Sequence, residues 1–307
     1  MRTLTHTVFV TGLFALNTHM NLCAEQTNSA AAIPTGKLAF VTSDGFGSAG
    51  NIYVMAGQHQ TKTLAYMTRE LEFLPDGNRI IYSSDDIEAP GIYIYDLKQH
   101  ANMPLLTNIM SAESPAWSPD GTRIAFVVWP KGRKNSQIYT ANADCSEVKQ
   151  LTTGDYYNWT PRWSPDGKKL VFETTRNDSA ATHVPGGYRD IYVMDSDGQN
   201  QINLTAKTFG HHPAWSPDGK FIAYMARGIM VMKADGSDKR NVSQGKTRDS
   251  EPVWSPDGQW IAFTRTANKP PGPETMDIWI MKSDGTEQRQ VTFNKTKWSS
   301  YSPSWSK

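Results

Sequence analysis

The sequence predicts an all-β protein: a six-bladed β-propeller of four-stranded antiparallel blades, closed by the C-terminal strand joining the N-terminal blade. Three observations predict this fold. The tetrapeptide Ser-Pro-Asp-Gly occurs at 118–121, 164–167, 216–219 and 255–258, with a variant Leu-Pro-Asp-Gly at 74–77. The copies follow one another at intervals of about 45 residues, the length of one propeller blade. The last residues of the chain repeat the opening of such a unit and then stop.

Each unit has the same order of strands and turns. In the unit that begins at Pro252, the predicted strands cover 252–254, 260–264, 277–281 and 290–292. Ser-Pro-Asp-Gly at 255–258 places Pro at the second and Gly at the fourth position of a type I turn, which folds the chain back. The strands are rich in β-branched and aromatic residues, which pack well on a pleated surface. One unit therefore builds one four-stranded blade.

The other units repeat this pattern in register. Third strands are predicted at 91–95, 190–194 and 229–232, and outer strands at 105–107, 151–152, 203–205 and 241–243. Helical periodicity is absent from these units. A large ring stands at one position of every repeat, and we interpret these residues as core: Phe73, Trp117, Trp163, Trp215, Trp254 and Trp305.

The two ends of the chain predict ring closure. Residues 37–41 and 51–55 match the second and third strands of a first blade that has no inner strand before them. Residues 302–306 match an inner strand and have nothing after them. We expect these segments to pair, which completes blade one and removes the exposed edges of an open array.

The repeat resembles that of a known family. Pro-x-Trp-Ser-Pro-Asp-Gly, an Ile-Ala-Phe strand, Asp-Ile-Tyr-Val-Met and a later Asp-Gly are similar to the WD-like repeat of TolB propellers, over residues 34–307. The resemblance implies a component of the periplasmic Tol-Pal system whose propeller binds the peptidoglycan-associated lipoprotein. TolB carries an α/β domain before its propeller. Only residues 1–33 precede the first predicted blade here, so we expect that domain to be missing.

The N-terminus predicts export. Arg2, the apolar run 8–16 and Leu22-Cys23-Ala24 are typical of a signal peptide at 1–24, followed by a linker at 25–33 and the propeller at 34–307. We therefore predict a periplasmic protein. No other stretch approaches the roughly 18 apolar residues that span a bilayer, so the mature chain should have no transmembrane segment. Lys plus Arg total 31 against 30 Asp plus Glu, which gives no bulk attraction to nucleic acid. We expect a monomer.

The candidate site is the mouth of the central channel. The turns on one face are uniformly short, whereas the loops at 128–137, 175–189 and 266–276 are long and share the face at which each inner strand begins. Binding should favour that face. Residues entering the inner strands form a varied polar and aromatic set, with Asp249 one residue further out. The predicted partner-binding residues are Arg69, Glu70, Glu113, Trp159, His211, His212, Asp249, Glu251 and Tyr301.

Two functions fit this set. The first is a non-catalytic module that binds a protein or peptide of the cell envelope through the channel mouth, with no cofactor and no resident metal. We find no Gly-x-Ser-x-Gly nucleophile motif. The alternative is a metal-assisted enzyme acting on a carbohydrate or lactone, in which His211 or His212 is a ligand and Glu113 or Glu251 a ligand or base. Adjacent strand residues point to opposite faces, so only one of the two histidines should face the axis.

Overall fold

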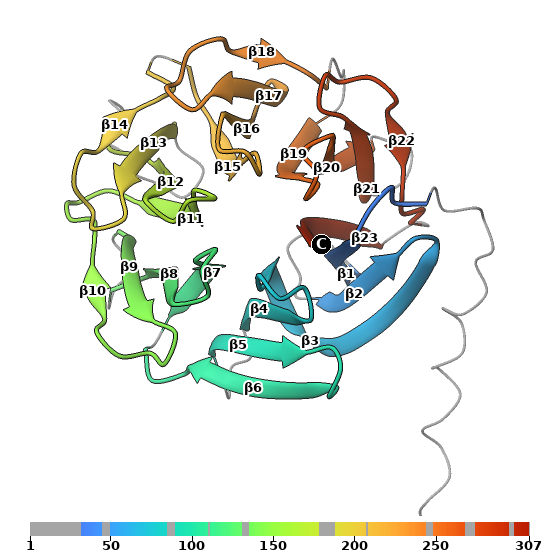
Figure 1. Cartoon of the computed structure of the whole chain (residues 1–307), viewed down its shortest axis with the longest axis horizontal. Helices are drawn as coiled ribbons and strands as arrows, with labels where there is room; N and C mark the ends of the chain where they lie inside the picture. The colour runs from blue at the N-terminus through green and yellow to red at the C-terminus, as the bar shows by residue number, and fades with distance from the viewer. Residues whose placement is uncertain are drawn as a thin grey trace, which may run out of the picture.

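The computed structural model describes residues 32–44, 50–84, 90–109, 111–130, 135–177, 188–206, 208–243, 248–267, 274–294 and 298–306, and only the backbone path of 64–69. In these ranges every regular element is a β-strand. The strands form six blades of four antiparallel strands around an axis (Figure 1). The predicted signal peptide and most of the linker lie outside the described residues. None of the described residues forms a helix long and apolar enough to cross a membrane.

The blades follow one another along the chain, each from its inner to its outer strand. Blade one contains β23 (Ser299–Ser306), β1 (Lys37–Ser43), β2 (Gly50–Ala56) and the first part of β3 (His59–Phe73), and blade two the rest of β3, β4 (Arg79–Ser84), β5 (Gly91–Asp96) and β6 (Ala101–Leu106). Blade three is β7 (Ala112–Trp117), β8 (Arg123–Val128), β9 (Gln137–Asn142) and β10 (Lys149–Gln150); blade four is β11 (Asn158–Trp163), β12 (Lys169–Thr174), β13 (Asp190–Asp195) and β14 (Ile202–Asn203). Blade five is β15 (His211–Trp215), β16 (Phe221–Ala226), β17 (Gly228–Lys233) and β18 (Arg240–Asn241); blade six is β19 (Arg248–Trp254), β20 (Trp260–Ala267), β21 (Thr275–Lys282) and β22 (Arg289–Gln290).

The predicted closure is confirmed. β23 pairs antiparallel with β1, with Leu38 opposite Trp305 and Val41 opposite Tyr301. Trp305 also packs on the cluster that contains Leu38 and Phe40, and its indole Nε1 donates to the carbonyl oxygen of Thr35 at 2.7 Å. The last strand of the chain is thus the innermost strand of the first blade (Figure 1).

One strand serves two blades. β3 pairs with β2 through its first part, where His59 lies opposite Ala56, and with β4 through its last part, where Phe73 lies opposite Ile80. Blades one and two therefore share one seven-stranded sheet. The sequence pattern does not indicate this outer strand, because 59–65 lack the Leu-Thr, Val-Thr or Val-Ser pair that marks outer strands elsewhere.

Most outer strands differ from the prediction. In blades three to six they are two residues long and lie one or two residues earlier than expected. The reason is that a side chain takes the place of a backbone acceptor. A Thr or Ser hydroxyl of the outer segment accepts a hydrogen bond from the amide of the first isoleucine in the third strand. The pairs are Ile138 N to Thr152 Oγ1 (2.9 Å), Ile191 N to Thr205 Oγ1 (2.8 Å), Ile229 N to Ser243 Oγ (3.0 Å) and Ile278 N to Thr292 Oγ1 (2.8 Å). Short edges offer little template for pairing with another chain.

The Ser-Pro-Asp-Gly repeats have a structural role. Ser118 Oγ donates to Asp120 Oδ1 at 2.6 Å and accepts from the amide of Arg123 at 2.8 Å. The amide of Gly121 donates to the Ser118 carbonyl at 2.9 Å, with a φ of 74° at Gly121 that favours glycine. These hydrogen bonds hold the tight turn between the first and second strands.

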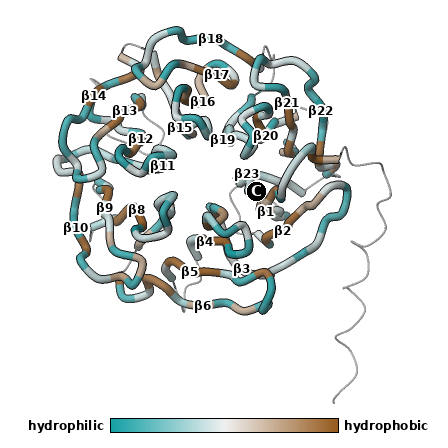
Figure 2. The backbone as a smooth tube through the Cα atoms, in the orientation of Figure 1, coloured by the Kyte–Doolittle hydropathy of each residue, from teal (hydrophilic) through white to brown (hydrophobic). Residues whose placement is uncertain are grey.

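The repeated large rings join neighbouring blades. The indole Nε1 of Trp163 in blade four donates to the carbonyl of Ala116 in blade three, and that of Trp254 in blade six to the carbonyl of Ala214 in blade five, each at 3.2 Å. Trp117, Trp163 and Trp254 are buried, and Phe73 is buried with them. Hydrophobic segments lie along the blades, for example in β2 and β8 (Figure 2).

Candidate functional site

The inner strands carry a repeated backbone irregularity next to the axis. In five blades the residue before the inner-strand proline has a left-handed φ of 46–53°: Ser114, Thr160, His212, Glu251 and Ser302. The register between inner and second strand shifts at this point in every blade, including blade two, where Glu70 holds the position. A left-handed conformation costs a non-glycine residue roughly 1–3 kcal/mol, and a β-bulge re-aims the side chain that carries it.

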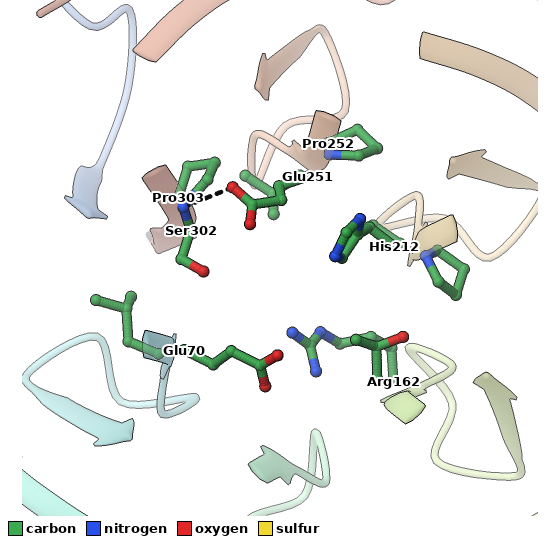
Figure 3. A pocket seen from close by; sticks show the side chains of 12 residues that line it. Glu70, Arg162, His212, Glu251, Pro252, Ser302 and Pro303 are labelled. Carbon is green, nitrogen blue, oxygen red and sulfur yellow. Dashed lines mark hydrogen bonds between the residues drawn. The ribbon is translucent and has the colours of Figure 1, made fainter. Parts of the chain in front are cut away.

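These bulge residues line a cavity on the axis. Glu70, Thr160, His212, Glu251 and Ser302 surround a cavity of about 40 Å³ that opens to solvent. Figure 3 shows Arg162 and His212 pointing into this space, together with Glu70 and Glu251 from other blades. The remaining lining is Leu71, Pro213, Ala214, Pro252, Val253 and Pro303. Five blades contribute side chains of unlike chemistry to one space.

The charges of the cavity are incompletely paired. Glu72 Oε2 lies 3.9 Å from Arg162 Nε, an ion pair without a hydrogen bond. Burial raises the pKa of Glu72 to about 7, and the Arg162 charge only partly opposes this shift. Three of the buried polar atoms that have no hydrogen-bond partner lie on these residues: Oε2 of Glu70, Oε2 of Glu72 and Nδ1 of His212.

A second polar cluster lies beside the cavity, around the fully buried Glu173 of β12. Its Oε1 accepts from Thr160 Oγ1 at 2.6 Å and from the His212 amide at 2.7 Å. Its Oε2 accepts from Arg189 at 2.7 Å and lies 3.5 Å from His211 Nδ1. Burial alone would raise the pKa of Glu173, but His212, His211 and Arg189 outweigh it and hold this pKa well below its usual range. Glu173 is therefore a carboxylate in the folded protein at neutral pH.

Aromatic rings extend this cluster. Trp159 stacks on Tyr157 with ring centroids 4.9 Å apart, and Trp129 lies 6.0 Å from Trp159. The Arg189 guanidinium sits 4.0 Å from the centre of the Trp159 ring, and the Trp129 indole donates to Glu113. A guanidinium above an indole is a favourable cation–π arrangement, so Arg189 is held by both the carboxylate and the ring.

A carboxylate links consecutive blades at two junctions. At one junction the carboxylate lies on the second strand of its blade, and at the other it lies on the inner strand. Glu173 on the second strand of blade four accepts from the backbone amide of His212 in blade five. Glu251 on the inner strand of blade six accepts from the backbone amide of Ser302 in blade one at 2.8 Å and from Thr264 Oγ1 at 2.7 Å. The Thr160–Glu173 pair of blade four thus corresponds to the Glu251–Thr264 pair of blade six, with the hydroxyl and the carboxylate exchanged between the two strands. In each case the carboxylate holds the left-handed residue of the next blade.

The structure divides the predicted site residues into separate groups. Glu70, His212 and Glu251 line the cavity. Glu113, Trp159 and His211 belong to the flanking cluster. Asp249 is buried and accepts from Arg265 at 2.7 and 2.8 Å, within blade six. Tyr301 is buried in the core beside Val41. The side chain of Arg69 lies outside the described residues, as do most residues of the long loops.

Sequence reasoning missed four charged residues: Glu72, Arg162, Glu173 and Arg189. The sequence did distinguish two of them, Glu72 and Arg162. Both stand one residue before the repeated ring, a position that holds a small or apolar residue in the other four blades: Ala116, Ala214, Val253 and Ser304. Glu173 likewise interrupts an apolar strand. Among the described residues, no group of three His, Cys, Asp or Glu side chains is arranged to hold a metal ion.

Comparison with known proteins identifies the family. The family model of the TolB beta propeller domain matches residues 34–226. The chain belongs to the TolB β-propeller family. The Tol-Pal system protein TolB of Francisella tularensis subsp. tularensis is 28% identical to this TolB-type propeller over 202 residues, 62% of this chain and 44% of the relative. This propeller spans about half the length of the curated relatives it matches.

Solved structures share the fold. TolB from Acinetobacter baumannii superposes with a TM-score of 0.71 at 22% identity, over 88% of this TolB-type chain and 66% of that one. An oligogalacturonate lyase in complex with manganese superposes with a TM-score of 0.54 at 17% identity, over 85% of this chain and 74% of that one. At these identities the likeness shows the fold alone.

Proposed function

We propose that this TolB-type propeller is a non-catalytic periplasmic module that binds a protein or peptide partner of the cell envelope at the mouth of its channel. The observation that carries the proposal is the axial cavity, where bulge residues from five blades present carboxylate, imidazole, hydroxyl and guanidinium groups around one space. Concave sites with a few convergent polar groups are the usual place of recognition.

A rigid frame supports this role. Four of the five bulge residues that line the cavity, all except Glu70, are followed by a proline, and the amides of His212 and Ser302 are bound by buried or half-buried carboxylates. Preorganised side chains lose little freedom on binding, which favours affinity. The metal-assisted enzyme has less support, because the described residues contain no group of three candidate metal ligands.

Site-specific photocrosslinking tests the location of the binding face. A photoreactive phenylalanine analogue in place of Ser302 should crosslink a defined envelope protein, whereas the same group in place of Ile202, 56% exposed on an outer strand, should not. Equal crosslinking from both positions, or from Ile202 alone, would move the interface away from the channel.

A binding measurement then tests the residues. The first purified candidate is the soluble domain of the peptidoglycan-associated lipoprotein, the partner implied by the TolB resemblance, followed by any protein identified by crosslinking. An Arg162→Gln, His212→Gln double variant should weaken binding at least about tenfold, because both side chains point into the cavity. Lys239→Gln on the outer surface is the matched control. Unchanged affinity in a correctly folded double variant would count against the channel mouth.

Export is the other part of the proposal. Residues 1–30 fused to alkaline phosphatase, which is active only after export to an oxidising compartment, should give periplasmic activity. Replacing the apolar Phe9 and Leu13 by Lys should abolish that activity. Activity that survives this change would contradict the signal peptide.

A further inference from the structure

The axial cavity and the Glu72–Arg162 ion pair beside it contain buried polar atoms that have no hydrogen-bond partner in the protein. Oε2 of Glu70 and Oε2 of Glu72 are buried and receive no hydrogen bond, and Nδ1 of His212 is buried without a partner on the other side of the axis. Most buried polar atoms in folded proteins are paired. Two unpaired carboxylate oxygens in one region point to a ligand group that donates hydrogen bonds.

The charge of the cavity favours a cation. Among the described side chains, Glu70 and Glu251 line the cavity together with one guanidinium, that of Arg162, and Glu72 pairs with that guanidinium, so three carboxylates meet one guanidinium. The Arg162–Glu72 ion pair is long, at 3.9 Å, and leaves the Glu72 carboxylate available to a second cation. Low dielectric at this position strengthens the attraction.

The arrangement suits an ammonium better than a metal ion. A primary ammonium is a compact monocation with three N–H donors, which matches carboxylate oxygens. Among the described residues, no group of three metal-ligating side chains is placed to hold a metal ion. Leu71, Val253 and three prolines line the same space and would contact the methylene stem of a lysine.

We propose that the axial cavity receives a primary ammonium group of a peptide, from a lysine side chain or a free N-terminus, with the carboxylate of Glu70 as its acceptor and that of Glu72, beside Arg162, adding negative charge. This inference rests on the proposed function, because it names the chemical group that the channel mouth recognises.

The probe is n-butylammonium chloride, titrated into the purified full-length chain at pH 8 and followed by calorimetry, with tetramethylammonium chloride at equal ionic strength as the control that lacks N–H donors. Saturable millimolar binding of butylammonium and at least about tenfold weaker binding of tetramethylammonium are expected. Glu70→Gln and Glu72→Gln should each weaken butylammonium binding about tenfold, whereas Glu274→Gln, an exposed glutamate, should leave it unchanged. Equal binding of both cations, or no binding by the wild-type chain, would overturn the proposal without depending on any variant.

Three tripeptides separate the sources of the ammonium. Ac-Ala-Lys-Ala-NH₂ tests the lysine side chain, Ala-Ala-Ala-NH₂ the N-terminus, and Ac-Ala-Ala-Ala-NH₂ is the blank. Binding of either of the first two supports the proposal and identifies the source. Calcium chloride that displaces butylammonium stoichiometrically would make the cavity a metal site and overturn it. If partner binding depends on Arg162 and His212 but butylammonium does not bind, this inference is wrong and the proposed function stands. If butylammonium binds but the channel mouth has no role in partner capture, the proposed function is wrong and this inference stands.

Discussion

Glu173→Gln tests the view that one buried carboxylate holds the junction of blades four and five. The change keeps the shape and an acceptor oxygen for Thr160 and the His212 amide, but it removes the charge that faces Arg189 at 2.7 Å. Glu173 is fully buried and Arg189 is 17% exposed. Removing one partner of a buried ion pair typically costs about 3–5 kcal/mol, because the other charge is left uncompensated.

Urea unfolding at pH 7, followed by tryptophan fluorescence, measures this loss. We expect a lower midpoint at an unchanged urea dependence, since the surface exposed on unfolding stays the same. Glu274→Gln, which breaks the exposed pair with Arg248, should change the free energy of unfolding by less than about 1 kcal/mol. A Glu173→Gln loss as small as this control would refute the reasoning.

The pH dependence gives a second measure of the same residue. The folded-state pKa of Glu173 lies below its ordinary value, so the unfolded chain takes up a proton first as the pH falls. The stabilisation is complete above the unfolded pKa near 4.5 and is lost as the pH falls through the folded pKa. The free energy of unfolding of Glu173→Gln should therefore depend less on pH below 4.5 than that of the wild type. Parallel curves in acid would contradict the assignment.

Four further predictions follow from the fold and the cavity. Deleting the final ten residues removes β23 and should abolish cooperative thermal unfolding; a truncated chain that melts like the parent would show another route of closure. Trp163→Ala removes a buried indole and its hydrogen bond to Ala116, so chemical denaturation should show a free energy of unfolding lower by about 3–5 kcal/mol. A loss below about 1 kcal/mol would mean that this ring does not join the blades. Thr205→Val leaves the Ile191 amide without its hydroxyl acceptor and should cost about 1–3 kcal/mol by the same assay, whereas a neutral change would show that the hydroxyl does not hold the third strand. Burial raises the pKa of Glu72 from 4.5 to about 7, against the opposing charge of Arg162; Glu70, His212 and Glu251 line the nearby cavity. The protonated form is therefore favoured in the folded state: its stabilisation is complete below pH 4.5 and is lost as the pH rises through 7. Glu72→Gln should match the wild type near pH 4 and exceed its stability at pH 8 by about 1–3 kcal/mol, given the 26% exposure of the side chain; equal stability at pH 8 would contradict the raised pKa.

The candidate site was only partly predictable. The repeat placed Glu70, His212 and Glu251 at one position of their inner strands, and the structure brings them to one cavity. Asp249 stands two residues and Tyr301 one residue before that position, yet each turns away, into an ion pair and into the core. The bulge accounts for this, because in five blades it gives one residue a left-handed conformation and directs the residues before it elsewhere.

Local sequence determined the blades. The Pro-Asp-Gly turns and the alternation of β-branched and aromatic residues depend on contacts within one unit of about 45 residues. The incomplete first and last units also determined closure, since each lacks the strand that the other supplies.

Only the tertiary structure decided which charges meet. Glu72 and Arg162 stand two blades apart, and Glu173 meets His212 from the next blade. Such pairs join residues 39 to 90 positions apart in the chain, where no local pattern relates one partner to the other. The burial of these carboxylates likewise arises only when the six blades enclose the axis. This burial raises the pKa of Glu72, and it would raise the pKa of Glu173 if the neighbouring cations were absent.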